Sequence, residues 1–200
     1  GQAMQEAVPK GAGAMAAILG LDDEQVILAC KQAAGDEIVS AVNFNSPGQV
    51  VIAGEAAAVE RAIEEAMQLG ARKAIPLPVS VPSHCALMQN AAEKLAQRLE
   101  EVEFRPATMP VVQNVDARVC ESVAEIRDAL VRQLFLPVRW VECVQYMARH
   151  GADGLLECGP GKVLAGLNRR IDRGMGMYPV YDSASLEAAL EKTATGSEHE

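Results

Sequence analysis

One segment of the chain reads Val79-Ser80-Val81-Pro82-Ser83-His84-Cys85-Ala86-Leu87-Met88. It separates a run of predicted strands and helices from a long amphipathic helix. His84 follows a proline and directly precedes that helix. Of the three histidines it is the only one in a setting that suggests chemistry, because His150 lies at a predicted helix C-terminus and His199 in a polar tail.

The residues before this segment predict a complete small α+β unit. Ser46-Pro47-Gly48 supplies a turn between two strand-type apolar runs, and Asp22 and Asp23 are favourable residues for a helix start. The predicted elements are, in order, strand 14–21, helix 25–33, strand 38–45, strand 49–54, a helix with Val59, Ala62, Ile63, Ala66 and Met67 on one face, and strand 73–79. This β-α-β-β-α-β order predicts a ferredoxin-like subdomain over residues 11–79, preceded in residues 1–10 by the end of a helix.

The residues after this segment alternate between helices and strands. The predicted elements are a helix with the stripe Met88, Ala92, Leu95, Leu99 and Val102, a buried strand 110–115, a helix 124–135, a helix from Pro137 with Trp140, Val144 and Met147 inward, strand 154–158, helix 163–170, strand 178–181 and helix 185–192. Such alternation is typical of a parallel layered sheet, so residues 80–192 are predicted to form part of a larger α/β domain. Residues 193–200 are small and polar and predict a disordered tail.

Composition excludes several classes of function. Half of the 200 residues are apolar, and the net charge of −9 argues against a nucleic-acid partner, whose phosphates attract Lys and Arg. No apolar run is long enough to span a membrane. The five cysteines are widely spaced without a Cys-x-x-Cys pair, which argues against a zinc site and favours free thiols in a reducing cytoplasm. We therefore expect no metal, no nucleic acid, no membrane and a cytoplasmic location.

The sequence offers a base without a convincing nucleophile. Ser83 and Cys85 adjoin His84, but adjacent side chains diverge and do not readily form a nucleophile–base pair. No Gly-x-Ser-x-Gly elbow occurs in the chain. The run 159–162, Gly-Pro-Gly-Lys, is not a Walker A sequence and is interpreted as a tight strand-to-helix turn, although its helix N-terminus would suit an anion.

Three amides are candidates for polar recognition. Gln133 lies on an apolar helix face, where its partners are either nearby backbone groups or a catalytic imidazole that it orients. Asn43 and Asn45 share one face of a strand. They either cap the hairpin turn or bind a ligand, and the residues alone favour the turn.

Five motifs closely resemble those of bacterial malonyl-CoA:acyl-carrier-protein transacylases, and the resemblance runs in order from about Met4 to about Lys192. They are MAAI (15–18), VNFNSPGQVVIAG (42–54), PVSVPSHCALM (78–88), IRDALVRQL (126–134) and GPGKVL (159–164). The resemblance implies an α/β-hydrolase-like parallel-sheet domain with an inserted ferredoxin-like subdomain. It also implies ping-pong transfer, in which a serine takes malonyl from coenzyme A and passes it to the phosphopantetheine thiol of acyl carrier protein, without a further cofactor.

The resemblance assigns a role to each candidate residue. It makes His84 the general base and the main-chain carbonyl of Gln133 its orienting partner. It places Asn43 and Asn45 in the coenzyme A cleft, and Met4 in the malonyl pocket. The family's nucleophile elbow, oxyanion glutamine and carboxylate-binding arginine would all precede Gly1. We therefore expect this chain to be the C-terminal two-thirds of the enzyme and to be inactive alone.

Further expectations concern partners and alternatives. The resemblance implies fatty-acid biosynthesis, acyl carrier protein and a coenzyme A thioester as partners, and a monomeric full-length parent. One alternative is a non-catalytic module that binds acyl carrier protein or another partner. The other is an acyltransferase domain of a polyketide synthase.

Overall fold

The chain divides within one helix into two compact units, Gly1–Cys143 and Val144–Glu200. The computed structural model describes residues 1–79 and 81–194. The first unit contains, in chain order, α1 (Gln2–Ala7), β1 (Gly13–Leu19), α2 (Asp23–Ala34), β2 (Val39–Ser46), β3 (Gln49–Glu55), α3 (Ala56–Gln68), β4 (Lys73–Pro76), a 3-10 helix (Ala86–Met88), α4 (Gln89–Glu100), β5 (Val112–Gln113), β6 (Arg118–Val119) and α5 (Val123–Arg132). The dividing helix is α6 (Trp140–Arg149).

Four antiparallel strands form the main sheet of the first unit, in the order β2-β3-β1-β4. In the centre of the sheet, Ala16 of β1 lies opposite Ile52 of β3 and Pro76 of β4. The Asp22 side chain accepts a hydrogen bond of 2.8 Å from the Gln25 backbone N–H, so the predicted start of α2 is confirmed. Gly48 adopts φ +68° in the turn between β2 and β3, a conformation that favours glycine. The observed order of strands and helices matches the predicted one.

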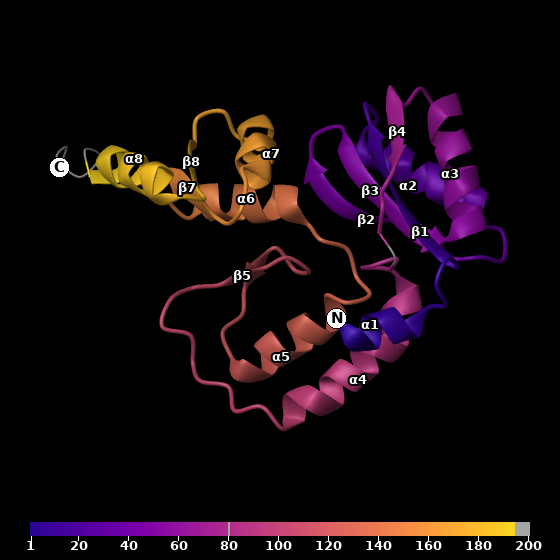
Figure 1. Cartoon of the computed structure of the whole chain (residues 1–200), viewed down its shortest axis with the longest axis horizontal. Coiled ribbons are helices and arrows are strands. Elements are labelled where there is room, and N and C mark those ends of the chain that lie inside the picture. Colours follow the sequence, from indigo (N-terminus) through magenta and orange to yellow (C-terminus); the bar gives the residue numbers. More distant parts are fainter. Residues whose placement is uncertain (80, 195–200) are drawn as a thin grey trace. The chain divides into compact units, whose positions relative to one another are not determined.

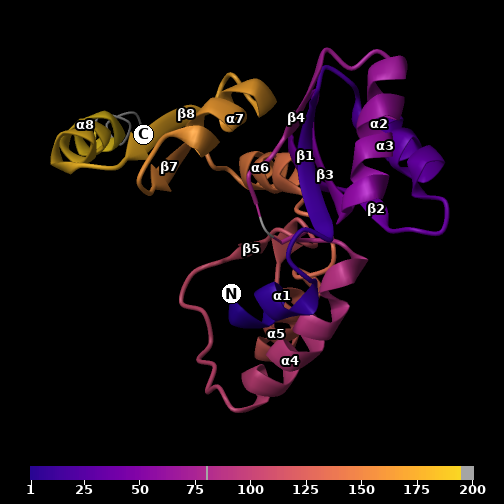
Figure 2. The same ribbon diagram turned by 45° about the vertical axis from the view of Figure 1, so that its right-hand side comes forward.

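The two faces of this sheet have different covers, because successive side chains along a strand point to opposite sides. One face, with Ile18, Val50 and Ile52, packs against buried residues of α2 and α3. Figures 1 and 2 show these two helices side by side on that face. Each fully buried Val or Ile here stabilises the fold by about 1.5–3 kcal/mol.

The opposite face of the sheet carries the segment that contains His84. Met15, Ala17, Val42, Val51 and Ala53 form a second buried cluster with Cys85, and Leu77 and Leu87 pack against it. Cys85 is therefore an apolar anchor in the core. It seats the residues on either side of it against the sheet.

Pro82 lies against the start of β1. The Pro82 side chain is fully buried. A Cβ atom built on Gly13 would lie 2.5 Å from Cγ of Pro82, so the start of β1 has room for the proline ring only because residue 13 is a glycine.

Several sequence predictions are corrected after residue 88. The predicted buried strand 110–115 is a two-residue strand, β5, in a short hairpin with β6, and Val111 is half exposed. The predicted stripe that ends at Val102 is broader than the buried one, because Val102 is exposed, and the same holds for the earlier stripe that ends at Met67. Pro137 precedes α6 and does not begin it. The helical stripes and the strand 110–115 were predicted from the pattern of apolar residues. That pattern does not show which other elements cover a helix or a strand.

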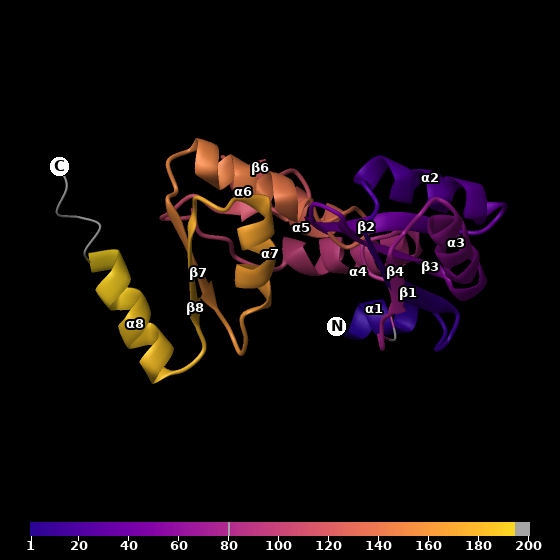
Figure 3. The same cartoon turned by 90° about the horizontal axis from the view of Figure 1, so that it is seen from above.

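The second unit contains a parallel strand pair, as predicted from strand–helix alternation. β7 (Gly154–Cys158) pairs in parallel with β8 (Gly176–Val180), and α7 (Val163–Ile171) connects them. Figure 3 shows α7 beside these two strands. The last helix, α8 (Ser183–Ala194), includes the first two residues of the predicted tail, and the Thr193 hydroxyl donates to the Ala189 carbonyl at 3.0 Å. The rest of that tail lies outside the described residues.

None of the helices in the described part of the chain is both long and apolar enough to span a membrane.

We predict that Gly13→Ala destabilises the first unit. The added methyl group would overlap the buried, rigid ring of Pro82, and overpacking of this kind costs about 1–3 kcal/mol. Urea denaturation measures the loss. The control is Gly166→Ala in α7, where an added Cβ meets nothing within 4 Å and the higher helix propensity of alanine favours folding. Equal stability of the two variants would contradict the close approach.

Candidate active site

His84 has an uncommon main-chain conformation. Its φ of +65° lies in the left-handed region, which non-glycine residues rarely adopt, although histidine does so more often than most. The His84 backbone N–H donates a 3.0 Å hydrogen bond to the Leu134 carbonyl, 50 positions later in the chain. The conformation is thus held by a tertiary hydrogen bond and by the buried neighbours Pro82 and Cys85.

The His84 ring contacts the main-chain carbonyl of Gln133, the residue before Leu134. Nδ1 lies 2.6 Å from the main-chain carbonyl oxygen of Gln133. A carbonyl oxygen only accepts hydrogen bonds, so Nδ1 carries a proton and donates it. In the neutral imidazole, Nε2 is then the unprotonated nitrogen, which is the state that a general base requires.

Gln133 uses its main chain and its side chain for different purposes. Its carbonyl follows the last residue of α5, where helical carbonyls lack intrahelical partners, and therefore accepts from His84. Its side-chain amide donates to the carbonyls of Leu136 (3.1 Å) and Pro137 (3.4 Å). Both interpretations of Gln133 are therefore partly correct. Its side-chain amide is bound to nearby backbone and its nitrogen also lies 3.5 Å from His84 Nδ1, while its main-chain carbonyl faces the imidazole.

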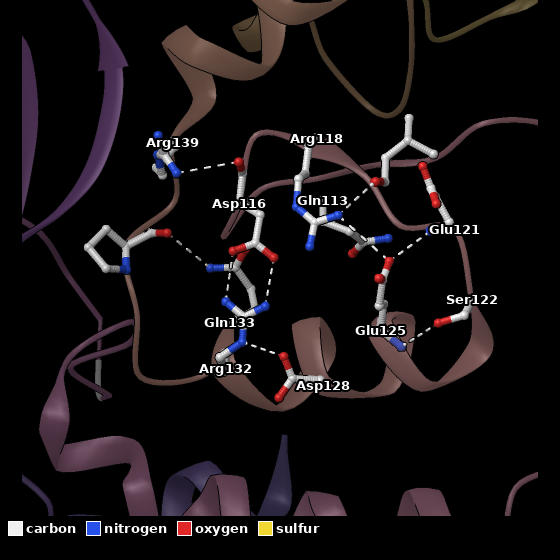
Figure 4. A network of polar contacts seen from close by, with 12 residues as sticks. Gln113, Asp116, Arg118, Glu121, Ser122, Glu125, Asp128, Arg132, Gln133 and Arg139 are labelled. Atoms are coloured by element: carbon white, nitrogen blue, oxygen red, sulfur yellow. Dashed lines mark hydrogen bonds and ion pairs between the residues drawn. The ribbon is translucent and has the colours of Figure 1, made fainter.

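An ion-pair network surrounds the C-terminal end of α5 (Figure 4). Arg132 donates two hydrogen bonds to the carboxylate of Asp116, at 2.8 and 2.6 Å, and a third of 2.6 Å to Asp128. Arg139 donates a 3.3 Å hydrogen bond to the main-chain carbonyl of Asp116 and pairs with the Glu142 carboxylate. The hydrogen bonds from the Arg132 guanidinium hold the pKa of Asp116 below its ordinary value.

The residues around Val138 join this region to the main sheet. The Val138 N–H donates 2.8 Å to the Val42 carbonyl, and the Phe44 N–H donates 2.9 Å to the Val138 carbonyl. Val138 thereby makes an isolated parallel bridge to Asn43 on the free edge of β2. The segment between Gln133 and Arg139 is consequently attached to the sheet as well as to His84.

Asn43 and Asn45 lie near the end of β2 and are half-buried. Neither side chain makes a hydrogen bond to another residue in the described part of the chain. The turn-capping role that the residues alone favoured is therefore wrong within those residues.

Met4 lies on α1, which packs against α4 and against the 3-10 helix that follows His84. The Met4 side chain is half-buried, and α1 has no fully buried residue. The structure thus brings the helix that carries Met4 next to the His84 segment.

The thiol beside His84 is not a nucleophile. Cys85 is 1% exposed, its Sγ donates to the Pro82 carbonyl at 3.1 Å, and burial raises the pKa of the thiol. All five cysteines are free, as predicted, and burial raises the pKa of Cys30 to about 12. Inert, buried thiols of this kind are packing residues.

The predicted turn at 159–162 does lead into a helix, but the helix start is occupied. The Glu157 carboxylate accepts from the Leu164 and Ala165 N–H groups, at 2.9 and 2.7 Å. These N–H groups would otherwise face an anion. An internal carboxylate therefore replaces the external anion that the sequence left open.

Sequence reasoning missed Asp116 and Arg132. Arg132 directly precedes Gln133, which is a usable signal. Asp116 lies in the turn between β5 and β6, a hairpin that periodicity did not reveal. Nothing in the local sequence indicates that these two residues, 16 positions apart, form an ion pair.

Comparisons with known proteins agree over most of the chain. The family model of the acyl transferase domain matches residues 1–170. Malonyl CoA-acyl carrier protein transacylase of Escherichia coli K12 is 56% identical over 192 residues, which are 96% of this chain and 62% of that protein. This chain thus spans about three-fifths of the length of the curated relatives that it matches.

Solved structures of malonyl transacylases are also similar to this chain. A malonyl-transacylase in complex with its type II polyketide synthase acyl-carrier protein superposes with a TM-score of 0.94 at 56% identity, over 96% of this chain and 62% of that one. Malonyl-CoA:acyl carrier protein transacylase from Xanthomonas oryzae superposes with a TM-score of 0.94 at 50% identity, over 96% and 61%.

We predict that Asp116→Asn lowers stability in a pH-dependent way. At neutral pH the variant loses charge-assisted hydrogen bonds to Arg132, which lowers the free energy of unfolding by about 1–2 kcal/mol. The folded-state pKa of Asp116 lies below its unfolded value of about 3.9. The contribution of the carboxylate is therefore present above that value and is lost as the pH falls through the folded-state pKa.

Urea denaturation of both proteins at a series of pH values measures this difference, which should shrink to nothing in acid. Asp128→Asn is the control, because Asp128 binds the same arginine but is 63% exposed, and it should change stability by less than about 0.5 kcal/mol. A difference for Asp116→Asn that persists unchanged in acid would refute the assignment.

Proposed function

The chain belongs to the family of acyl transferase domains, and we propose that the whole protein transfers malonyl from coenzyme A to the phosphopantetheine thiol of acyl carrier protein in fatty-acid biosynthesis. The 2.6 Å contact between His84 Nδ1 and the Gln133 carbonyl carries this proposal, because it leaves Nε2 of the imidazole free to accept a proton. The names of the relatives, which are malonyl transacylases, supply the substrate class.

The proposed mechanism is a two-step, ping-pong transfer. A serine hydroxyl, supplied by residues outside this chain, attacks the malonyl thioester while His84 Nε2 takes its proton, and that proton leaves with the thiol of coenzyme A. In the second step the phosphopantetheine thiol gives its proton to Nε2 and attacks the malonyl–serine ester. The serine oxygen leaves and recovers the proton, so the enzyme is regenerated.

We assign the remaining candidate residues to substrate binding. We assign Asn43 and Asn45 to the coenzyme A cleft, because their half-buried amides make no hydrogen bond to another described residue. We assign Met4 to the malonyl pocket, since α1 lies against the helix that follows His84.

The proposed architecture follows the same division. The sheet order β2-β3-β1-β4, with α2 and α3 on one face, supports a ferredoxin-like subdomain over residues 11–79. The parallel β7–β8 pair connected by α7 supports an α/β-hydrolase-like domain for residues 80–192. A reducing cytoplasm suits its five free thiols.

Two alternatives each have one observation in their favour. The lack of a Gly-x-Ser-x-Gly elbow in these 200 residues favours a binding role for this chain by itself, with acyl carrier protein as the partner. The similarity to a malonyl-transacylase that was solved with a polyketide synthase carrier protein favours a role in polyketide synthesis.

We predict that this chain alone forms no malonyl adduct. Loss of the serine of a catalytic triad costs on the order of a millionfold in turnover. Intact-mass spectrometry after incubation with malonyl-CoA should show the unmodified chain. A malonyl ester on a serine of this chain would disprove the proposed division of labour.

We predict that His84→Ala blocks serine malonylation in a protein that also contains the nucleophile segment. Removing a general base costs at least about 10²–10⁴ in rate. Gln133→Ala should cost much less, because alanine keeps the main-chain carbonyl that contacts His84. Single-turnover malonylation compares the two variants with the parent. Equal rates for His84→Ala and the parent would contradict the role of His84.

A further inference from the structure

We propose that Asp116 is a positioning residue for His84, acting through Arg132 to hold the Gln133 carbonyl against the imidazole. The inference rests on the proposed function, since it matters for transfer only if His84 is the base. The contact itself is observable without any transfer.

The segment 132–139 is attached at both ends to one turn. At its start, the Arg132 side chain binds both carboxylate oxygens of Asp116. At its end, the Arg139 N–H donates 2.9 Å to the Asn114 carbonyl, and the Arg139 side chain donates to the Asp116 carbonyl. Gln133 lies directly after the first of these attachments, as Figure 4 shows.

The turn that receives both ends is itself constrained. It connects β5 and β6, and the Ala117 N–H closes it with a 2.8 Å hydrogen bond to the Gln113 carbonyl. Ala117 has φ +51°, which is unfavourable for alanine, so the turn adopts a specific conformation against a local preference.

Geometry and burial make the Asp116–Arg132 pair different from the surface ion pairs nearby. Its two side chains are 19% and 27% exposed, whereas the Arg118–Glu125 pair of the same hairpin and helix is 50% and 42% exposed. Two parallel hydrogen bonds fix the direction of the guanidinium plane as well as its distance. The main chain at residue 132, and hence the next carbonyl, is thereby held in place.

The position of the Gln133 carbonyl matters because the imidazole of His84 must be held accurately. A catalytic group works only within about 0.5 Å of its productive position. The Gln133 carbonyl decides which ring nitrogen of His84 carries the proton, because it accepts from Nδ1. A shift of this carbonyl would release the imidazole to the other tautomer, which has no lone pair on Nε2.

The test reads the tautomer of His84 directly in the 200-residue chain. Long-range ¹H–¹⁵N spectra of ¹⁵N-histidine-labelled protein, recorded at the pH where the neutral imidazole is observed, distinguish Nδ1–H from Nε2–H. We expect Nδ1–H in the parent chain. In Asp116→Asn the ratio of Nδ1–H to Nε2–H should fall about fivefold, the weight of one net hydrogen bond.

Two further variants separate positioning from general stability. Arg118→Gln removes the exposed ion pair between the same hairpin and the same helix and should leave the tautomer ratio unchanged. Arg132→Lys keeps the charge but loses the bidentate geometry, and should lower the ratio as well. If Asp116→Asn does not fold, Arg132→Lys provides the measurement.

An unchanged tautomer ratio in folded Asp116→Asn or Arg132→Lys would overturn the proposal and leave the pair a purely structural one. An equal fall in Arg118→Gln would overturn it too, because any loosening of the hairpin would then suffice. If a protein with the nucleophile segment fails to transfer malonyl while the ratio still responds to Asp116, the positioning contact is supported and only the proposed function fails.

Discussion

The candidate site depends on a single hydrogen bond, from Nδ1 of His84 to the main-chain carbonyl of Gln133. The first unit must hold both residues in place for this bond to form. The two residues are 49 positions apart in the chain. A contact of 2.6 Å between such distant residues demands that both backbones be fixed independently. A second hydrogen bond, from the His84 N–H to the Leu134 carbonyl, joins the two backbones directly.

The main sheet supplies the fixed frame for both. Its apolar second face takes Cys85 and Leu87 and so seats the His84 segment, with Pro82 against Gly13. The edge of β2 takes Val138 and so seats the Gln133 segment. Burial holds the first segment. Backbone hydrogen bonds to β2, together with the side chains of Arg132 and Arg139 on Asp116, hold the second.

Local signals were sufficient for part of this result. Asp22 as a helix cap, the turn at Gly48 and the alternation of strands and helices up to residue 79 all express preferences of a few neighbouring residues. The residues alone made His84 and Gln133 candidates, the resemblance gave them their roles, and the structure has the contact between them that the resemblance implied. Their catalytic roles stay a prediction.

The parts that the sequence did not reveal depend on distant partners. Asp116 has a partner only because the β5–β6 hairpin places it beside Arg132. In the described part of the chain Asn43 and Asn45 lack the turn contacts that their position suggested, and the register of β2 is irregular beside them. Met67 and Val102 fit buried helical stripes by periodicity, yet their side chains are exposed. Periodicity reports which side chains share a face, and only tertiary packing decides whether that face is covered.

The bridge between Val138 and β2 also affects how molecules of this protein meet one another. The outer strands of a sheet expose unpaired backbone groups, which readily recruit a strand from another molecule. On β2, Val138 already uses the Val42 carbonyl and the Phe44 N–H. On the opposite border, Pro76 in β4 and Pro78 just after it have no N–H to offer. Both borders of the main sheet therefore offer fewer free backbone groups to a strand of another molecule than open edges would.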